Sequence, residues 1–327
     1  MTVPPELAAE RRRRVVAAMA GAELDVVVLG RQDDVTYASG IERLWTAGTR
    51  PFGAGCVVVR DGHELGRVHV MSSWDAGIPD SIDFDDLLPL TWNPATMTTN
   101  LAGIPGLADA RRVGVDAWSP GFARTISRIA PEAELVVADD VLAETRRRKL
   151  PAEIGLIRDA CGLVWRGVDA ALAASSAGPA TTSHLRAVAV EALAAAGVTI
   201  PSSGVSVQAK GGDLVIDVGM IVDGYEGGVG GRFVDGERAD PTSPLVDACR
   251  DGATWPELAA AATTGRWHVR GLGLGAERPV LDASTGRAET LVADMVLSVA
   301  DGPRRDVVAV RAGGAPEVLS ARVAPAP

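Results

Sequence analysis

A single carboxylate in a glycine-rich stretch is the clearest candidate for chemistry in this sequence. Residues 215–233 read VIDVGMIVDGYEGGVGGRF, so Asp217 interrupts an apolar, strand-like run, and four glycines follow between positions 227 and 231. A buried carboxylate without a partner is costly, so Asp217 needs a metal ion, a substrate group or a cation beside it. The stretch has the form of a metal or catalytic site that retains one ligand.

Two further residues have side chains suited to proton transfer. His268 lies in RWHVRGLGLGAERP, and a neutral imidazole is a suitable general base near pH 7. Glu277 follows in the same segment. The structural alternatives are a hydrogen-bonded histidine at a strand end and a solvated surface charge. The candidate catalytic residues are therefore His268, Asp217 and Glu277.

Cations and neutral polar groups complete the candidate site. In the absence of a metal ion, an arginine can neutralise Asp217, and its planar fork can also bind a substrate carboxylate through two hydrogen bonds. An Asp–Arg pair kept only for structure is the alternative. Tyr225 either binds substrate or anchors its turn. The candidate substrate-binding residues are Tyr225, Arg232, Arg270, Arg305 and Gln208.

Composition narrows the class of protein. The chain has 327 residues, of which 47% are hydrophobic, and this is enough for two domains with their own cores. Its net charge of −10 argues against binding to nucleic acid or to an anionic membrane. No long apolar run predicts a membrane span or a signal peptide. Three widely spaced cysteines are typical of a cytoplasmic protein with reduced thiols.

The first half of the chain alternates strands and helices, which predicts an α/β domain over residues 1–148. Ser119 and Pro120 predict the N-cap and first position of a helix. Trp45, Trp74 and Trp92 lie in or beside loops, where they would line a pocket, a dimer contact or the core. The predicted elements are a helix over 6–21, strands over 24–30 and 111–116, and a hairpin over 56–60 and 66–71.

The second half has a different pattern. A long helix is predicted from about 152 to 175, because Ile154, Ile157, Cys161, Val164, Val168 and Leu172 form one stripe at helical spacing. A second helix follows over 181–196, and strands with glycine turns follow after residue 200. Two helices over a curved antiparallel sheet predict an α+β domain over residues 149–327.

Several of these segments, in this order, resemble the pita-bread metallopeptidases, which include aminopeptidase P, prolidase and the metal-free creatinase. LDVVVLGRQDDVTYASG at 24–40 resembles the start of the creatinase-type N-terminal domain, and GDLVIDVGMIVDGY at 212–225 resembles the strand pair with the first metal-binding aspartate. DMVLSVADG and RDVVAVRAGGAPEVLS resemble the last two core strands. The resemblance covers nearly the whole chain and implies a creatinase-type N-terminal domain, a shortened pita-bread domain and a homodimer.

The resemblance also implies where metal ligands would lie. In the family two divalent ions share two Asp, one His and two Glu. Carried over in that order, the ligands fall on Asp217, Gly228, His268 or (two residues along) Arg270, Ala300 and Arg305. Too few ligands remain for a dinuclear centre, and an added cation opposes one. We therefore expect no metal cofactor, and an Arg305–Asp217 ion pair in its place.

The metal-free mechanism of creatinase does not carry over either. It uses a histidine from the segment that corresponds to SSGVSVQAKGGD at 202–213, and this segment has no histidine. Three hypotheses follow. The first is a metal-independent hydrolase or lyase on a small amino-acid-like or guanidino substrate. The second is a non-catalytic pseudo-peptidase that binds a partner or ligand. The third is a Xaa-Pro dipeptidase with metal ligands at other positions.

Overall fold

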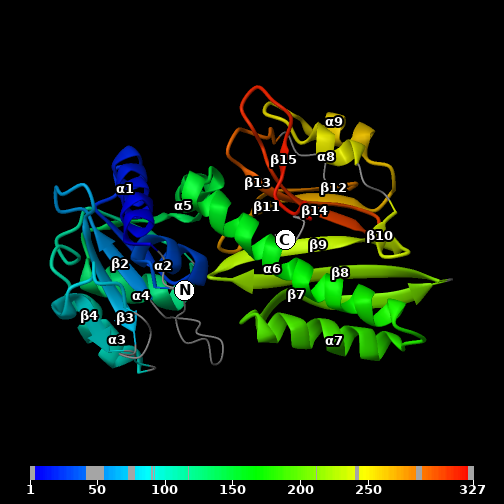
Figure 1. Cartoon of the computed structure of the whole chain (residues 1–327). Helices are drawn as coiled ribbons and strands as arrows, with labels where there is room; N and C mark the ends of the chain where they lie inside the picture. The colour runs from blue at the N-terminus through cyan, green and yellow to red at the C-terminus, as the bar shows by residue number, and fades with distance from the viewer. Residues whose placement is uncertain are drawn as a thin grey trace. The chain divides into compact units, whose positions relative to one another are not determined.

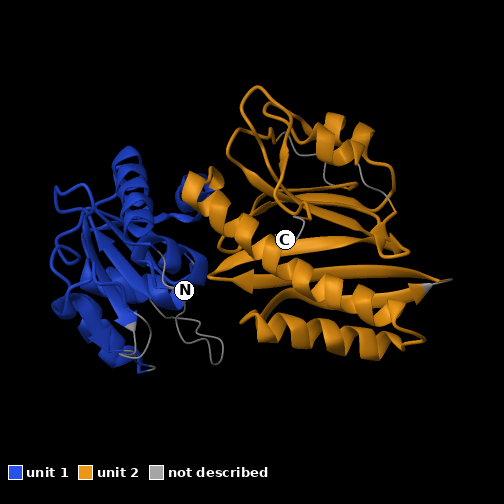
Figure 2. Ribbon diagram, viewed as in Figure 1, with its two compact units in different colours: residues 1–146 blue, residues 147–327 orange. Residues whose placement is uncertain are grey.

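The computed structural model describes residues 4–41, 55–72, 78–89, 91, 93–116, 118–210, 212–239, 243–284 and 289–322. The chain forms two compact units, residues 1–146 and 147–327 (Figure 2). This division lies two residues before the expected boundary between 148 and 149. Trp45, Trp74 and Trp92 lie outside the described residues.

Unit 1 is the expected α/β domain. Its six-stranded mixed sheet has the order β4-β3-β2-β1-β5-β6, in which β1 runs parallel to β5 and antiparallel to β2. The predicted hairpin is present as β2 and β3. The strands are β1 (Val26–Leu29), β2 (Cys56–Val59), β3 (Arg67–Ser72), β4 (Leu87–Pro89), β5 (Arg112–Val115) and β6 (Glu134–Val137); the helices are α1 (Pro5–Gly21), α2 (Gln32–Ser39), α3 (Pro94–Ala102), α4 (Pro120–Ile129) and α5 (Asp139–Arg147), with a 3₁₀ turn at Phe84–Asp86.

Helix α4 begins as the sequence predicts. The Ser119 hydroxyl accepts a hydrogen bond from the Phe122 amide at 3.2 Å, and Pro120 holds the first helical position. The side chains of Phe122, Ile126 and Ile129 then pack into the core of unit 1.

We expect Ser119→Ala to lower the free energy of unfolding of unit 1 by about 1 kcal/mol, because an amide at the start of α4 loses its side-chain acceptor. Urea unfolding measures this effect. Ser119→Asp is the matched control, since it restores an acceptor and should restore stability. An alanine variant with unchanged stability would contradict the capping role.

Unit 2 contains a nine-stranded antiparallel sheet in which seven strands follow the order β12-β11-β13-β14-β9-β8-β7, while β10 pairs with β9 and β15 with β14. Helices α6 and α7 lie along β7, β8 and β9 (Figure 1). The strands are β7 (Ile200–Lys210), β8 (Asp213–Val222), β9 (Tyr225–Val234), β10 (Glu237–Arg238), β11 (Trp267–Leu272), β12 (Ala276–Asp282), β13 (Val296–Asp301), β14 (Arg304–Ala309) and β15 (Glu317–Val318); the helices are α6 (Pro151–Ser176), α7 (Thr182–Ala195), α8 (Pro244–Ala248) and α9 (Trp255–Ala261).

Helix α6 extends one residue beyond each end of the predicted helix, and the whole predicted apolar stripe is buried. Its C-terminal part packs with α7 against Ile216, Val218 and Val229 of the sheet. Gly227 allows close approach here, since a Cβ at this position would lie 2.5 Å from the backbone of Ala160 in α6. The opposite face of β8 and β9 is thereby left to Asp217, Gly228 and Gly230.

The sheet of unit 2 consists of two half-sheets that meet at a narrow seam. The first half-sheet is β7, β8, β9 and β10, and the second is β11, β12, β13, β14 and β15. At the seam, the backbone pairing of β14 with β9 in the described residues consists of Arg305 opposite Gly230. No helix in the described part of the chain is long and apolar enough to cross a membrane.

Candidate functional site

A row of residues crosses the sheet of unit 2 and passes through the seam. Residues directly opposite one another on antiparallel strands place their side chains on the same face of a sheet. Asp217 and His268 are therefore on one face, with Arg305 between them. From β7 to β11 the row is Ser206, Asp217, Gly230, Arg305, Ala300 and His268.

Arg305 forms the expected ion pair with Asp217. Its Nε lies 2.7 Å from Asp217 Oδ1, and its Nη1 lies 3.3 Å from Glu226 Oε1. Arg270 Nη2 approaches both oxygens of Glu226, at 2.5 and 2.6 Å. The two arginines come from the second half-sheet and the two carboxylates from the first. We call Asp217, Glu226, Arg270 and Arg305 the Arg305 cluster.

The guanidinium of Arg305 occupies space that glycines leave open. A Cβ at Gly228 would lie 2.9 Å from Arg305 Nη1, and one at Gly230 would lie 2.6 Å from Asp217 Oδ1. Arg305 is 7% exposed, and its Nη2 is buried without a hydrogen-bond partner in the described part of the chain. The glycines noted in the sequence therefore accommodate an internal cation.

Arg238 on β10 reinforces the seam from the opposite face of the sheet, since it pairs with Phe233 and lies against Gly231. Its Nη2 donates to the carbonyl oxygens of Gly230 and Arg305, the latter at 2.9 Å, and its Nη1 lies 2.8 Å from Asp306. Asp306 is fully buried and also contacts Arg304 Nε at 2.7 Å. Arg238 thus joins backbone carbonyl groups of β9 and β14.

His268 lies at the exposed end of the row. The residue is exposed, yet surrounding protein atoms remove part of its hydration, and this loss lowers its pKa; the nearby cations Arg270 and Arg305 lower the pKa further. Among the described residues, no hydrogen bond or ion pair joins His268 to Asp217. The imidazole is therefore neutral at pH 7 and separated from the candidate carboxylate by Arg305.

Glu277 lies outside the Arg305 cluster. It is 6% exposed on β12, and its Oε2 lies 2.5 Å from Lys149 Nζ. The structural alternative, a solvated surface charge, was wrong, because a lysine 128 residues away in the sequence pairs with Glu277. Burial with this partner also gives no support to a catalytic role.

Tyr225 is a core residue in this structure. Its side chain is fully buried, and its hydroxyl donates to Glu153 Oε1 on α6 at 2.6 Å. The position fits the structural alternative, an anchor at the start of β9, and gives no support to substrate binding.

Arg232 and Gln208 lie on the same face of the sheet as the Arg305 cluster, in the adjacent row through Val215. Both residues are exposed, and Arg232 Nη1 lies 3.3 Å from Asp213 Oδ2. The structure thus brings Asp217 and Arg305 into direct contact and links Arg270 to Arg305 through Glu226. Arg232, Gln208 and His268 lie around them.

Glu226 is the site residue that sequence reasoning missed. It is 8% exposed and contacts both arginines of the Arg305 cluster. The strand period of two contained the signal, since residues 226, 228 and 230 must share one face. The family resemblance implies a metal ligand at the position of Gly228 and none at Glu226, so it does not point to Glu226.

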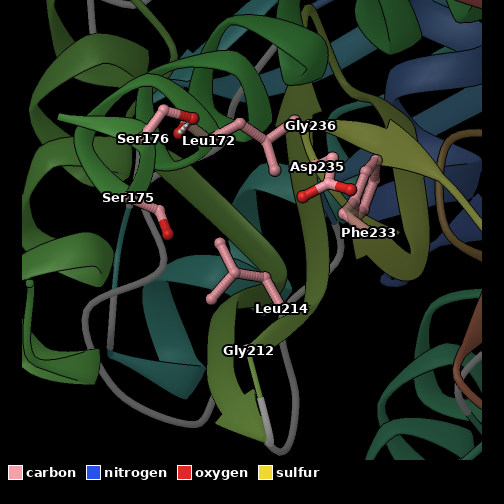
Figure 3. A pocket seen from close by; sticks show the side chains of 8 residues that line it. All are labelled: Leu172, Ser175, Ser176, Gly212, Leu214, Phe233, Asp235 and Gly236. Atoms are coloured by element: carbon pink, nitrogen blue, oxygen red, sulfur yellow. Dashed lines mark hydrogen bonds between the residues drawn. The ribbon is translucent and has the colours of Figure 1, made fainter. Parts of the chain in front are cut away.

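A pocket of about 250 Å³ adjoins the Arg305 cluster. Glu226 and Arg270 form its charged wall, Ser202 and Ser203 contribute hydroxyls, and Ile221 and Leu274 contribute apolar surface. A second pocket, of about 170 Å³, is lined by Leu172, Ser175, Phe233 and Asp235 among others and contains none of the predicted site residues (Figure 3).

A separate buried cluster lies at the carboxyl ends of β1 and β5 in unit 1. Asp116 accepts hydrogen bonds from the amides of Gly30 and Arg31 at 2.5 and 2.9 Å, and Asp34 lies beside it. Arg146 contacts Asp33 and Asp34 at 2.8 and 3.0 Å. Burial is the main cause that raises the pKa of Asp34 to about 8 and that of Asp116 to about 6.

Within the described residues, no group of three or more His, Cys, Asp or Glu side chains is arranged to hold a metal ion. Of the positions that correspond to the family's five ligands, Asp217 pairs with Arg305, while Gly228 and Ala300 carry no donor side chain. The donor set present does not fit a dinuclear centre.

Comparisons with known proteins agree with this architecture. Residues 11–147 match the family model of the creatinase/prolidase N-terminal domain. No curated protein sequence matches the chain significantly.

Solved structures match over nearly the full length. The prolidase from Pyrococcus furiosus has 18% identity and a TM-score of 0.67, with 95% of this chain and 99% of that chain covered. The Xaa-Pro dipeptidase from Bacillus anthracis has 15% identity and a TM-score of 0.68, with coverage of 97% and 98%. The aminopeptidase PepP of Pseudomonas aeruginosa has 18% identity and a TM-score of 0.68, with 99% of this chain and 97% of that chain covered. Residues 11–147 therefore form a creatinase/prolidase N-terminal domain, and the chain as a whole has the fold of these prolidases and aminopeptidases, in which a pita-bread domain follows.

Proposed function

We propose that this chain is a prolidase and aminopeptidase P homologue that has lost the dinuclear metal centre and acts as a non-catalytic binding protein for a small molecule. The observation that carries the proposal is the buried Arg305 guanidinium, which pairs with Asp217 and Glu226 in the space beside Gly228. A fixed cation at this position repels a divalent ion and consumes the carboxylates that would bind it.

The arrangement of titratable groups also favours binding over catalysis. Catalysis by proton transfer requires a base and its partner within hydrogen-bond reach of one reacting atom. His268 is separated from Asp217 by Arg305 in the row, and Glu277 pairs with Lys149 elsewhere. The pocket beside Glu226 and Arg270 remains, and it can hold a ligand without a convergent acid and base.

A metal-independent hydrolase or lyase on a small amino-acid-like or guanidino substrate is the second candidate function. It is favoured by the lowered pKa of His268, which keeps the imidazole neutral and able to accept a proton at pH 7. Arg305 and Arg232, on the same face, would then orient a substrate carboxylate.

We further propose a homodimer in the cytoplasm. The family resemblance supports the dimer. The three cysteines support the location, since Cys56, Cys161 and Cys249 are all buried as free thiols.

Metal loading tests the proposal directly. We expect the chain, incubated with zinc, manganese or cobalt and then desalted, to retain far less than one ion per chain and to hydrolyse no Xaa-Pro dipeptide. A chelator should leave the melting temperature unchanged. We also expect the variant Arg305→Glu to retain far less than one ion per chain, because Gly228 and Ala300 still lack donor side chains.

A prolidase treated identically is the positive control. Stoichiometric metal, or a dipeptidase activity abolished by chelator, would identify the chain instead as a Xaa-Pro dipeptidase with ligands at other positions. Turnover of an amino-acid-like compound without metal, if the variant His268→Asn abolishes this turnover, would favour the second candidate.

A further inference from the structure

Two consecutive serines on β7 point toward the same place. Side chains of successive strand residues normally alternate between faces. The β7–β8 register shifts between Pro201 and Gly204, so Ser202 and Ser203 lie in a bulge, and bulges re-aim side chains. A Cβ at Gly219 would meet the hydroxyls of both serines, with Ser202 Oγ 2.7 Å away and Ser203 Oγ closer still.

The same point beside Gly219 also lies against the Arg305 cluster. Arg305 Nη1 is 2.9 Å from it. Arg305 Nη2 is buried without a hydrogen-bond partner in the described part of the chain. Both serine residues are exposed, and within the described residues neither hydroxyl has a hydrogen-bond partner in the protein. Two hydroxyl donors and a guanidinium therefore converge beside Gly219, and both serines line the pocket of about 250 Å³.

This geometry is suited to a carboxylate. Hydroxyl and guanidinium groups donate to its two oxygens, and hydrogen bonds of this kind to an ionised group are about twice as strong as neutral ones. The serines lie on the wall of the 250 Å³ pocket, which Ile221 and Leu274 also line. A pocket of this size is smaller than those that hold drug-sized ligands.

The charges of the Arg305 cluster indicate which second charged group the ligand carries. Two arginines and two carboxylates make the Arg305 cluster neutral, so an anion would meet Asp217 and Glu226 as well as the cations. The side chain of Asp217 is 38% exposed, and Glu226 lines the pocket, so either can accept a hydrogen bond from a ligand ammonium. A zwitterion satisfies both sets of groups without adding net charge.

We propose that the pocket beside the Ser202–Ser203 bulge binds a free α-amino acid with a short aliphatic side chain. The carboxylate lies on Ser202, Ser203 and Arg305, the ammonium faces Glu226 and Asp217, and the side chain packs on Ile221 and Leu274. This inference rests on the proposed binding function and names its ligand class.

Calorimetric titration of the purified full chain with L-leucine tests the proposal. We expect saturable binding at millimolar concentration. Isoamylamine lacks the carboxylate and 4-methylpentanoate lacks the ammonium, so each should bind at least about tenfold more weakly. The double variant Ser202→Ala/Ser203→Ala should lose about tenfold in affinity at an unchanged melting temperature, because both serine residues are exposed.

Ser175→Ala is the matched control, because Ser175 lines the other pocket (Figure 3), and this variant should bind leucine as the wild type does. Absence of saturable leucine binding, equal affinity for the two truncated probes, or full affinity in the double variant would overturn the assignment. Metal content and dipeptide hydrolysis, measured on the same sample, test the proposed function separately, so the two failures are distinguishable.

Discussion

Replacing Arg305 with alanine is expected to lower the free energy of unfolding by about 3 kcal/mol, near the lower end of what removal of one partner from a buried ion pair costs. Glu226 would remain buried with Arg270 as its remaining ion-pair partner, and Asp217 would lose its cation. The partial exposure of Asp217 reduces its share of the penalty, because water can solvate it. Urea unfolding of unit 2 measures the effect.

Arg232→Ala is the matched control for this experiment. Its pair with Asp213 is exposed, and Arg232 lies on β9, the strand of Glu226. Exposed pairs contribute about 0–1 kcal/mol, so this variant should remain close to wild type. If Arg305→Ala were as stable as Arg232→Ala, the Arg305 cluster would have no role in holding the seam together.

The second large effect concerns pH and Asp34. This residue is 3% exposed, and burial raises its pKa from the ordinary value of 3.8 to about 8. Because the folded state then binds more protons than the unfolded state, the contribution of Asp34 to stability is full below pH 3.8 and is lost as the pH rises to about 8. The neighbouring carboxylates of Asp33 and Asp116 raise the pKa of Asp34 further, although Arg146 opposes them.

Asp34→Asn removes this titration while keeping the shape of a protonated carboxyl group. We expect its stability relative to wild type to rise across the window by up to about 1.4 kcal/mol per pH unit. Hydrogen exchange of the β1 amides in urea reports the unfolding of unit 1 separately from unit 2. Asp109→Asn, at an exposed position of unit 1, should show no such trend. A difference between Asp34→Asn and wild type that stays constant with pH would contradict the buried proton.

Strand periodicity explains which parts of the site could be predicted. The order of apolar runs and glycine turns gave the fold class of both units. The ion pair of Arg305 with Asp217 could be predicted because Arg305, on β14 opposite Gly230, and Asp217 both lie on the sheet face that helix α6 leaves uncovered. Local signals of this kind depend only on the period of two and on which strands are neighbours.

Long-range pairing explains what could not be predicted. Glu277 can be buried because it forms an ion pair with Lys149, and Tyr225 can be buried because Glu153 accepts a hydrogen bond from its hydroxyl group. Neither partner is close in sequence to the residue that it satisfies. The Ser202–Ser203 bulge is likewise set by a shift in register between β7 and β8, which an alternating pattern of side chains does not reveal.

The narrow seam between the half-sheets has a consequence for the order of folding. Each half-sheet is built from strands that are neighbours or near neighbours in the chain, whereas Arg305 and Asp217 are 88 residues apart. Contacts between distant residues require a large loop to close and form late. We therefore expect the Arg305 ion pairs to form after the transition state, so that their loss would accelerate unfolding while the rate of folding stays nearly constant. Arg305 would then determine how long unit 2 stays folded rather than how fast it folds.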